Sequence, residues 1–139
     1  MSRIMAIDYG DARTGVALSD VSGTLVGQAQ TLTLTGKKLV AAIVDMAGEH
    51  QVDTVVVGLP RNMDGSYGFR AEITQTFADK LRVRGLTVVL RDERLTTVSA
   101  HNILSTQNKR GDKRKGLVDS VAAGLILQEY LDYQKQASE

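Results

Sequence analysis

The stretch IMAIDYGDARTGVALSD, residues 4–20, decides the fold of this chain. Two short apolar runs, residues 3–9 and 14–19, are joined by a turn that begins at Gly10, which is the pattern of a β-hairpin. Residues 28–34 then alternate apolar side chains with threonine, as a half-exposed strand does. We therefore expect the chain to open with three antiparallel strands.

Helical and strand patterns alternate in the rest of the chain. Helical spacing of apolar residues predicts helices over residues 37–50, 69–84, about 96–107 and about 118–135, and the dense apolar runs at 54–58 and 87–90 predict buried strands. This alternation implies parallel pairing. We predict an α/β fold with a five-stranded mixed sheet, in which strands one to three form an antiparallel meander, strands one, four and five are parallel, and helices cover both faces.

Length and composition exclude several classes of protein. At 139 residues, with one proline at a strand end, the chain is expected to be a single domain spanning 1–139. The absence of cysteine excludes disulfides, thiolate zinc sites and cysteine nucleophiles. No apolar stretch approaches the roughly 20 residues that cross a bilayer, and the first one is too short for a signal peptide. A cytoplasmic protein without a membrane partner is expected.

Three acidic residues stand beside apolar segments: Asp8, Glu93 and Asp119. A carboxylate next to buried hydrocarbon is costly unless a positive charge compensates it, so three of them suggest a shared cation. Asp8 ends the first predicted strand and Glu93 follows the fifth, and ligands of such sheets gather outside the carboxyl ends of parallel strands. Asp119 shares a helical arc with Ala122 and Ile126, which should face the sheet.

Three oxygen ligands suit Mg²⁺ or Mn²⁺ better than zinc, as one ion or as two. Such ions support in-line hydrolysis of phosphodiester bonds. Simpler roles remain open at each position. Asp119 could be a helix N-cap, Asp8 could only shape a turn, and Glu93 could form a surface ion pair. Asp92 competes with Glu93 as the second ligand, and we favour Glu93.

Basic residues are concentrated in one window. Five of the 17 lysines and arginines lie within residues 109–115, against one of the 16 acids, and they are Lys109, Arg110, Lys113, Arg114 and Lys115. We interpret the window as a cationic loop before Asp119 that contacts substrate phosphates, although most charge runs are merely solvated. The turn-rich segment GLPRNMDGS, residues 58–66, offers Arg61 as a further phosphate contact.

Four segments resemble the motifs of the YqgF family: AIDYGDARTGVALSD, VVVGLPRNMDGS, LRDERLTT and KGLVDSVAAGLIL. The similarity spans residues 4 to about 130. It implies a ribonuclease H-like fold shared with the RuvC junction resolvases, and a bacterial cytoplasmic nuclease that matures the 5′ end of pre-16S ribosomal RNA or resolves four-way DNA junctions. Family acids correspond to Asp8, Glu93 and Asp119. One departure from the RuvC pattern is that no acid follows the fourth strand, where Gly58, Leu59 and Pro60 stand.

Several functions compete at this point. We rank processing of precursor ribosomal RNA first and resolution of branched DNA second, because a symmetric junction favours a two-fold dimer and nothing in the sequence marks a dimer surface. The chain is expected to be a monomer or weak dimer, with ribosomal particles among its candidate partners. A non-catalytic nucleic-acid or ribosome-associated module is a third reading. Phosphotransfer is a fourth, but it needs two such domains to close a cleft.

Overall fold

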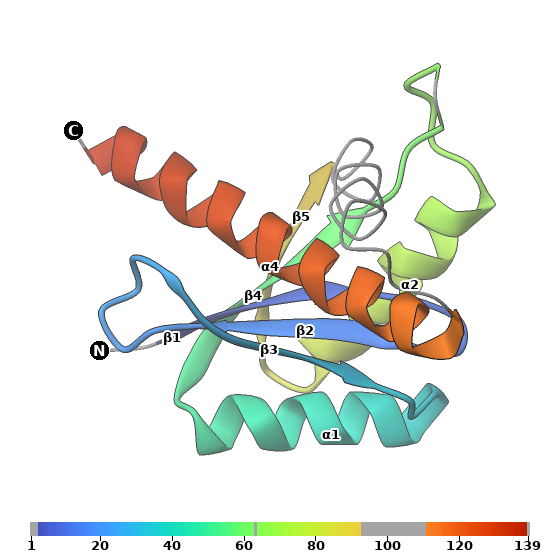
Figure 1. Ribbon diagram of the computed structural model, residues 1–139, viewed down its shortest axis with the longest axis horizontal. Coiled ribbons are helices and arrows are strands. Elements are labelled where there is room, and N and C mark those ends of the chain that lie inside the picture. The colour runs from blue at the N-terminus through green and yellow to red at the C-terminus, as the bar shows by residue number, and fades with distance from the viewer. Residues whose placement is uncertain (1–2, 63, 93–110, 139) are drawn as a thin grey trace.

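The computed structural model describes residues 3–62, 64–92 and 111–138, and of residues 111–119 and 138 it describes the backbone alone. Three strands come first along the chain, and helices and strands alternate after them (Figure 1). They are β1 Arg3–Asp8, β2 Thr14–Ser19, β3 Val26–Leu32, α1 Gly36–Glu49, β4 Val52–Leu59, α2 Phe69–Val83, β5 Thr87–Asp92 and α4 Gly111–Ser138.

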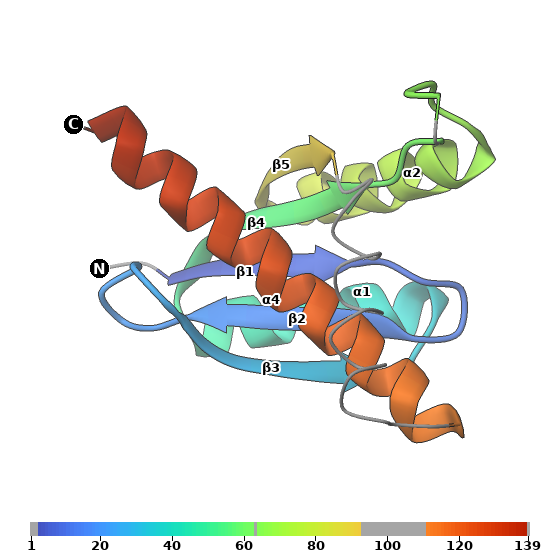
Figure 2. The ribbon, with the colours of Figure 1, turned by 45° about the horizontal axis from the view of Figure 1, so that its top comes forward.

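The strands form one five-stranded sheet in the order β3-β2-β1-β4-β5. The pairs β1–β2 and β2–β3 are antiparallel, whereas β1–β4 and β4–β5 are parallel. This arrangement confirms the predicted meander followed by parallel strands. Figure 2 shows β1, β4 and β5 pointing the same way, with β2 running back beside β1.

The strand register brings the carboxyl ends of the three parallel strands to one level. Ile7 of β1 pairs with Val57 of β4, and Val57 pairs with Leu90 of β5. One residue further on, Gly58 pairs with Arg91. Since β1 ends at the residue after Ile7, all three strands finish within about one residue of the same edge.

Helices cover both faces of the sheet, as predicted. On one face, β-strand side chains such as Ile7, Val55 and Val57 form a buried cluster with residues of α1 and α2. On the opposite face Ala6, Ala17 and Val56 are buried beneath α4, which crosses the sheet diagonally (Figure 2). The small alanine side chains let this helix approach the sheet closely.

Several element boundaries differ from the predictions, among them the ends of β4 and β5 by one or two residues and the starts of β3 and α4. The strand predicted at 28–34 begins at Val26, because a turn closed by a backbone hydrogen bond of 2.8 Å from Asp20 to Leu25 returns the chain earlier. The last helix, predicted from about residue 118, begins at Gly111: lysine and arginine are good helix formers, and the helix continues through Gly116 despite the low helix propensity of glycine. The helix predicted at 96–107 lies outside the described residues.

In the part of the chain that the structure describes, no helix combines the length and the apolar character needed to span a membrane.

Candidate active site

Asp8 is the last residue of β1 and pairs with Gly15 of the neighbouring β2. Side chains alternate between the faces of a strand. Ala6 is buried against α4, whereas Ile7 belongs to the cluster under α1 and α2. Alternation therefore assigns the half-buried Asp8 to the face that α4 covers, at the carboxyl edge of the sheet.

The turn after Asp8 is tightly closed. The backbone amide of Gly10 donates to the hydroxyl of Thr14 over 3.3 Å, and the Thr14 side chain is fully buried. A Cβ atom on Gly10 would collide with the carbonyl oxygen of Arg13. A glycine is thus required here for the chain to turn back within a few residues of the candidate ligand.

Helix α2 holds the same turn from the side. The Tyr9 ring stacks on Phe77 of α2, with centroids 4.2 Å apart and an angle of 12° between the planes. The Arg70 guanidinium donates to the Asp11 carboxylate over 2.7 Å and to the Tyr9 carbonyl oxygen over 3.2 Å. These contacts, called the Arg70 bracket below, could not be predicted from the sequence, because residues about 60 positions apart share no periodic pattern.

The second candidate ligand, Glu93, lies outside the described residues, and its neighbour Asp92 is fully described. The Asp92 carboxylate forms an ion pair with the Arg61 guanidinium over 2.8 Å. It also accepts a hydrogen bond of 3.2 Å from the Tyr67 hydroxyl. The Arg61 guanidinium also lies over the Tyr67 ring, 4.5 Å from its centroid. Asp92 therefore has two partners of its own, and Arg61, predicted to meet a phosphate, is engaged with it.

The loop between β4 and α2 has the turn chemistry that its sequence predicts. Asn62 and Ser66 close it with a backbone hydrogen bond of 2.8 Å, and Gly65 has a positive φ of 89°, which glycine adopts without strain. The Asp64 carboxylate accepts from the amide and the hydroxyl of Ser66 over 2.9 and 2.6 Å. These bonds fix the loop that presents Arg61 and Tyr67 at the carboxyl edge.

The third candidate ligand, Asp119, belongs to α4, where the structure describes its backbone alone. Three and four residues further along the helix, Ala122 and Ala123 are completely buried, and Ile126 is buried as well. These residues confirm the helix face that was predicted to meet the sheet. The carboxyl-terminal half of α4 borders the turn between β2 and β3, so its amino-terminal half extends toward the opposite edge, where β1 ends (Figure 2).

The prediction of a loop for the basic window is wrong for its second half. Lys113, Arg114 and Lys115 belong to the first turns of α4. Lys109 and Arg110 lie outside the described residues.

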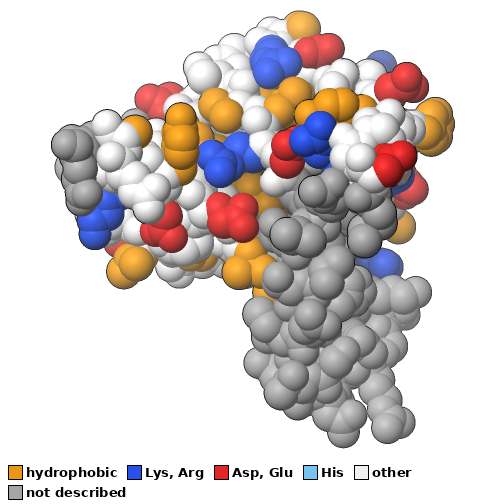
Figure 3. All heavy atoms as spheres, turned by 90° about the horizontal axis from the view of Figure 1, so that it is seen from above, with side chains coloured by type: hydrophobic (Ala, Val, Ile, Leu, Met, Phe, Trp, Pro, Cys, Tyr) orange, Lys and Arg blue, Asp and Glu red, His pale blue; other side chains and the backbone are white. Residues whose placement is uncertain are grey.

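Charges of both signs lie beside one another on the face seen in Figure 3. Among the described residues, three ion pairs join opposite charges: Arg61 with Asp92, Arg70 with Asp11 and Arg82 with Asp79. The described residues contain no group of three potential metal ligands. Of the three candidate acids only Asp8 is described in full, and a set of three carboxylates suits a hard divalent cation.

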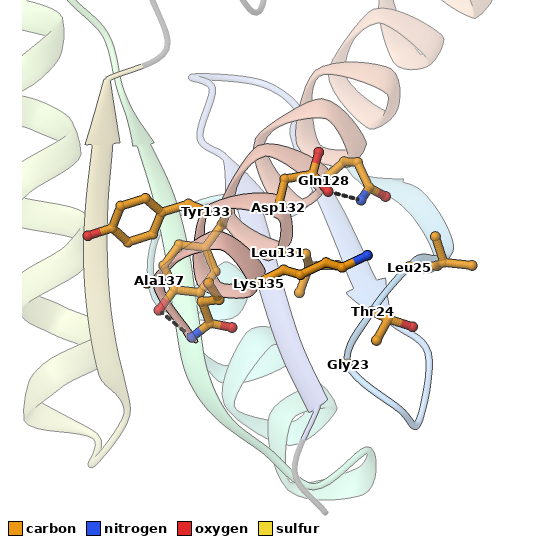
Figure 4. Close-up of a pocket in the computed structure, with 11 residues that line it drawn as sticks. Gly23, Thr24, Leu25, Gln128, Leu131, Asp132, Tyr133, Lys135 and Ala137 are labelled. Carbon is orange, nitrogen blue, oxygen red and sulfur yellow. Dashed lines mark hydrogen bonds between the residues drawn. The ribbon is translucent and has the colours of Figure 1, made fainter. Parts of the chain in front are cut away.

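A large hollow in the described part of the chain lies away from this edge (Figure 4). It has a volume of about 1040 Å³ between the turn at Gly23–Leu25 and the carboxyl-terminal half of α4, including Leu131 and Tyr133. The amide of Ile4, near the start of β1, donates to the hydroxyl of Ser19, which just precedes this turn. The hollow is therefore at the amino end of β1, opposite Asp8.

The sheet order, the helices on both faces and an acid at the end of β1 define an α/β protein of the ribonuclease H-like class. The chain belongs to the RuvX family, whose model, described as "Holliday junction resolvase", matches residues 2–133. Membership confirms the resemblance to the YqgF family noted in the sequence.

Named relatives match nearly the whole chain. A protein of Halothermothrix orenii called "Putative pre-16S rRNA nuclease" is 45% identical over 136 residues, which cover 96% of this chain and 97% of the relative. A protein of the same name from Fusobacterium nucleatum is 41% identical, covering 97% of this chain and 100% of the relative.

Solved structures share the fold at low sequence identity. RuvC of Thermus thermophilus in complex with a Holliday junction substrate superimposes with a TM-score of 0.56 at 12% identity, covering 97% of this chain and 96% of that one. The large terminase nuclease of thermophilic phage G20c with bound zinc has a TM-score of 0.56 at 14% identity, covering 88% and 79%. These likenesses show the fold.

Proposed function

We propose that this chain is a divalent-metal-dependent endonuclease that matures the 5′ end of pre-16S ribosomal RNA. The observation that carries the proposal is the position of Asp8, at the level where all three parallel strands end and on the face covered by α4. The names of the near full-length relatives support the choice of substrate.

Asp8, Glu93 and Asp119 would hold one or two Mg²⁺ or Mn²⁺ ions. Asp92 is on the α2 side of β5 and has its own partners, so by strand alternation we expect the next side chain on the α4 side with Asp8. Asp119 precedes the buried Ala122 and Ala123 by one helical turn, which favours the same side. When bound, the ion would supply charge stabilisation and an activated water for in-line hydrolysis.

The chain's own residues would orient the reacting strand. The Arg70 bracket and the Gly10 turn keep the end of β1 in place, so that the Asp8 carboxylate needs little reorganisation to act as a ligand. Lys113, Arg114 and Lys115, together with Lys109 and Arg110, would attract the phosphate backbone electrostatically. Arg61 would add a phosphate contact by exchanging its carboxylate partner for the substrate.

A second candidate function is resolution of four-way DNA junctions, which the description of the family model favours. The two functions share the chemical step and differ in the shape of the substrate. A junction resolvase must make two symmetric cuts, which calls for a dimer, so substrate preference and oligomeric state should change together.

Cleavage assays with purified protein test the proposal. Wild type and Asp8→Asn would be compared on precursor 16S RNA and on a four-way DNA junction, each with and without Mn²⁺. We expect metal-dependent cutting of the RNA by wild type and a loss of at least about a thousandfold in Asp8→Asn, since an amide is a poor substitute for a ligating carboxylate. Equal cutting by both proteins would refute the proposal.

Asp53→Asn is the matched control for this assay. Asp53 is an exposed aspartate near the amino end of β4, at the other end of the sheet, and the substitution makes the same chemical change. It should cut like wild type.

A further inference from the structure

A groove runs between α1 and α2 on the face of the sheet opposite α4. Its wider part, about 410 Å³, is lined by Lys37 and Val40 of α1 and by Lys80, Val83 and Arg84 at the end of α2. A narrower part of about 160 Å³ shares Val40 and Lys80 with it. The two hollows are therefore adjacent.

The narrow end of the groove reaches the carboxyl edge of the sheet, on the face opposite the one to which Asp8 is assigned. Its lining includes Tyr9, the residue after Asp8, and Gly36, the first residue of α1. Tyr9 is fixed there by its stacking on Phe77. A chain that leaves the edge of the sheet beside Asp8 would enter the groove by passing around the turn at Tyr9.

The groove is positively charged. Lys37, Lys80 and Arg84 are exposed, and among the described residues no acidic side chain lines either hollow. The acid of α2 nearest to its basic end, Asp79, is paired with Arg82 over 3.0 Å. The three cations therefore act on whatever occupies the groove.

The start of α1 adds to this field. Thr35 precedes the helix without a side-chain capping hydrogen bond, so the first backbone amides are not satisfied by that side chain. Such amides and the helix dipole favour an anion, here beside the ammonium group of Lys37.

We propose that this groove binds the sugar-phosphate backbone of the single strand that continues from the cleavage site. The cations contact phosphates, and Val83, which is 85% exposed, offers apolar contact to riboses or bases. The proposal rests on the proposed nuclease function, and it adds a strand-binding surface on the face of the sheet opposite α4, the helix that contains residues 113–115.

The test compares two double variants that remove the same charge. Lys80→Gln with Arg84→Gln alters the groove, and Lys38→Gln with Lys135→Gln alters exposed lysines that do not line it. Both are made in the Asp8→Asn protein, so that binding of fluorescent single-stranded RNA is measured without cleavage.

We expect the groove variant to bind long RNA about tenfold more weakly at low salt. The slope of log affinity against log salt should fall by about 1.4, because each lost phosphate contact in a single strand contributes roughly 0.7. The control double should change affinity less than about twofold. RNA that ends at the cleavage site should bind the groove variant and its parent equally.

Equal losses in the two doubles, or unchanged binding in the groove double, would overturn the proposal. An acidic peptide that occupies the groove without displacing RNA would overturn it as well. Failure of the proposed function would look different, because wild type with Mn²⁺ would then cut neither RNA nor junction while the binding comparison still gives its own answer.

Discussion

At the scale of single residues, the candidate site depends on how the turn after Asp8 is held. Gly10 gives the turn its close approach, Thr14 satisfies its amide, and Arg70 bridges Asp11 and the Tyr9 carbonyl. The position of Asp8 at a strand end was predictable, since the apolar run and the glycine mark it in sequence. The Arg70 contacts were not, because they join a helix to a loop through side-chain geometry.

Replacing Gly10 by alanine should disturb the turn directly. The new methyl group would meet the Arg13 carbonyl oxygen, so either the turn opens or the end of β1 moves. We expect a loss of roughly 1–3 kcal/mol in the free energy of unfolding and a larger loss of cleavage. Urea denaturation and the RNA cleavage assay would measure the two effects, and full activity would contradict the role given to this turn.

Arg70→Lys separates positioning from stability. Lysine keeps the charge but cannot bridge a carboxylate and a carbonyl with a planar fork. The Arg70–Asp11 pair is largely exposed, with side chains 46% and 80% accessible, so the stability loss should stay below about 1 kcal/mol. We expect kcat to fall several-fold with KM nearly unchanged.

Arg82→Lys is a close control for Arg70→Lys. Arg82 likewise bonds a carboxylate, Asp79, and a carbonyl oxygen, that of Val88, and its side chain is 43% accessible. It is not part of the turn after Asp8. If both variants lose activity equally, the Arg70 bracket has no particular role in positioning Asp8.

The pKa of Asp20 supplies a pH prediction at the turn between β2 and β3. The backbone amide of Thr24, helped by that of Leu25, stabilises the carboxylate and lowers its pKa from the usual 3.8. Because the folded pKa is lower than the unfolded one, the stabilisation is full above pH 3.8 and disappears as pH falls through the folded pKa.

Urea denaturation of wild type and Asp20→Asn at several pH values tests this linkage. The difference in stability should be constant from about pH 5 to 8, and it should shrink below about pH 4. A difference that grows on acidification would contradict the assignment.

At the scale of elements, α4 carries the largest difference between sequence and structure. Its apolar face, from Ala122 to Leu131, was predictable from helical spacing and is buried as expected. Its start at Gly111 was not predictable, because a run of lysine and arginine has the same composition in a solvated loop and in an exposed helix. Residues 113–115, which were expected to contact phosphates from a loop, therefore belong to a helix.

Two adjacent residues of α4 should respond in opposite ways to added side-chain atoms. Ala123 is completely buried in the cluster with Ala6 and Ala17, so Ala123→Leu should lift the helix from the sheet and cost roughly 1–3 kcal/mol. A Cβ on Gly124 meets nothing within 4 Å, so Gly124→Ala should stabilise by about 0.5–1 kcal/mol through helix propensity. Thermal unfolding distinguishes these outcomes.

The same pair tests whether α4 belongs to the site. Since Asp119 lies one turn before Ala123, Ala123→Leu should also reduce Mn²⁺-dependent cleavage by more than unfolding explains, whereas Gly124→Ala should leave it unchanged. Normal cleavage by folded Ala123→Leu protein would separate α4 from the metal site.

At the scale of the whole molecule, the sheet order follows from sequence because each segment has one consistent pattern. Antiparallel strands come first, and strands separated by helices follow in parallel. The convergence of distant acids at one edge is an expectation from that topology, and Asp8 is where the topology requires it. The partnership of Asp92 with Arg61 and Tyr67 was not predictable, because alternation sends neighbouring acids to opposite faces without specifying the side chains that each one meets.

Crystals soaked in Mn²⁺ test the central claim most directly, because anomalous scattering locates the ion independently of activity. We predict an ion with carboxylate oxygens of Asp8, Glu93 and Asp119 at about 2 Å, and no such peak in Asp8→Asn crystals. A well-ordered structure in which either Glu93 or Asp119 points away from Asp8, with no ion between them, would contradict it.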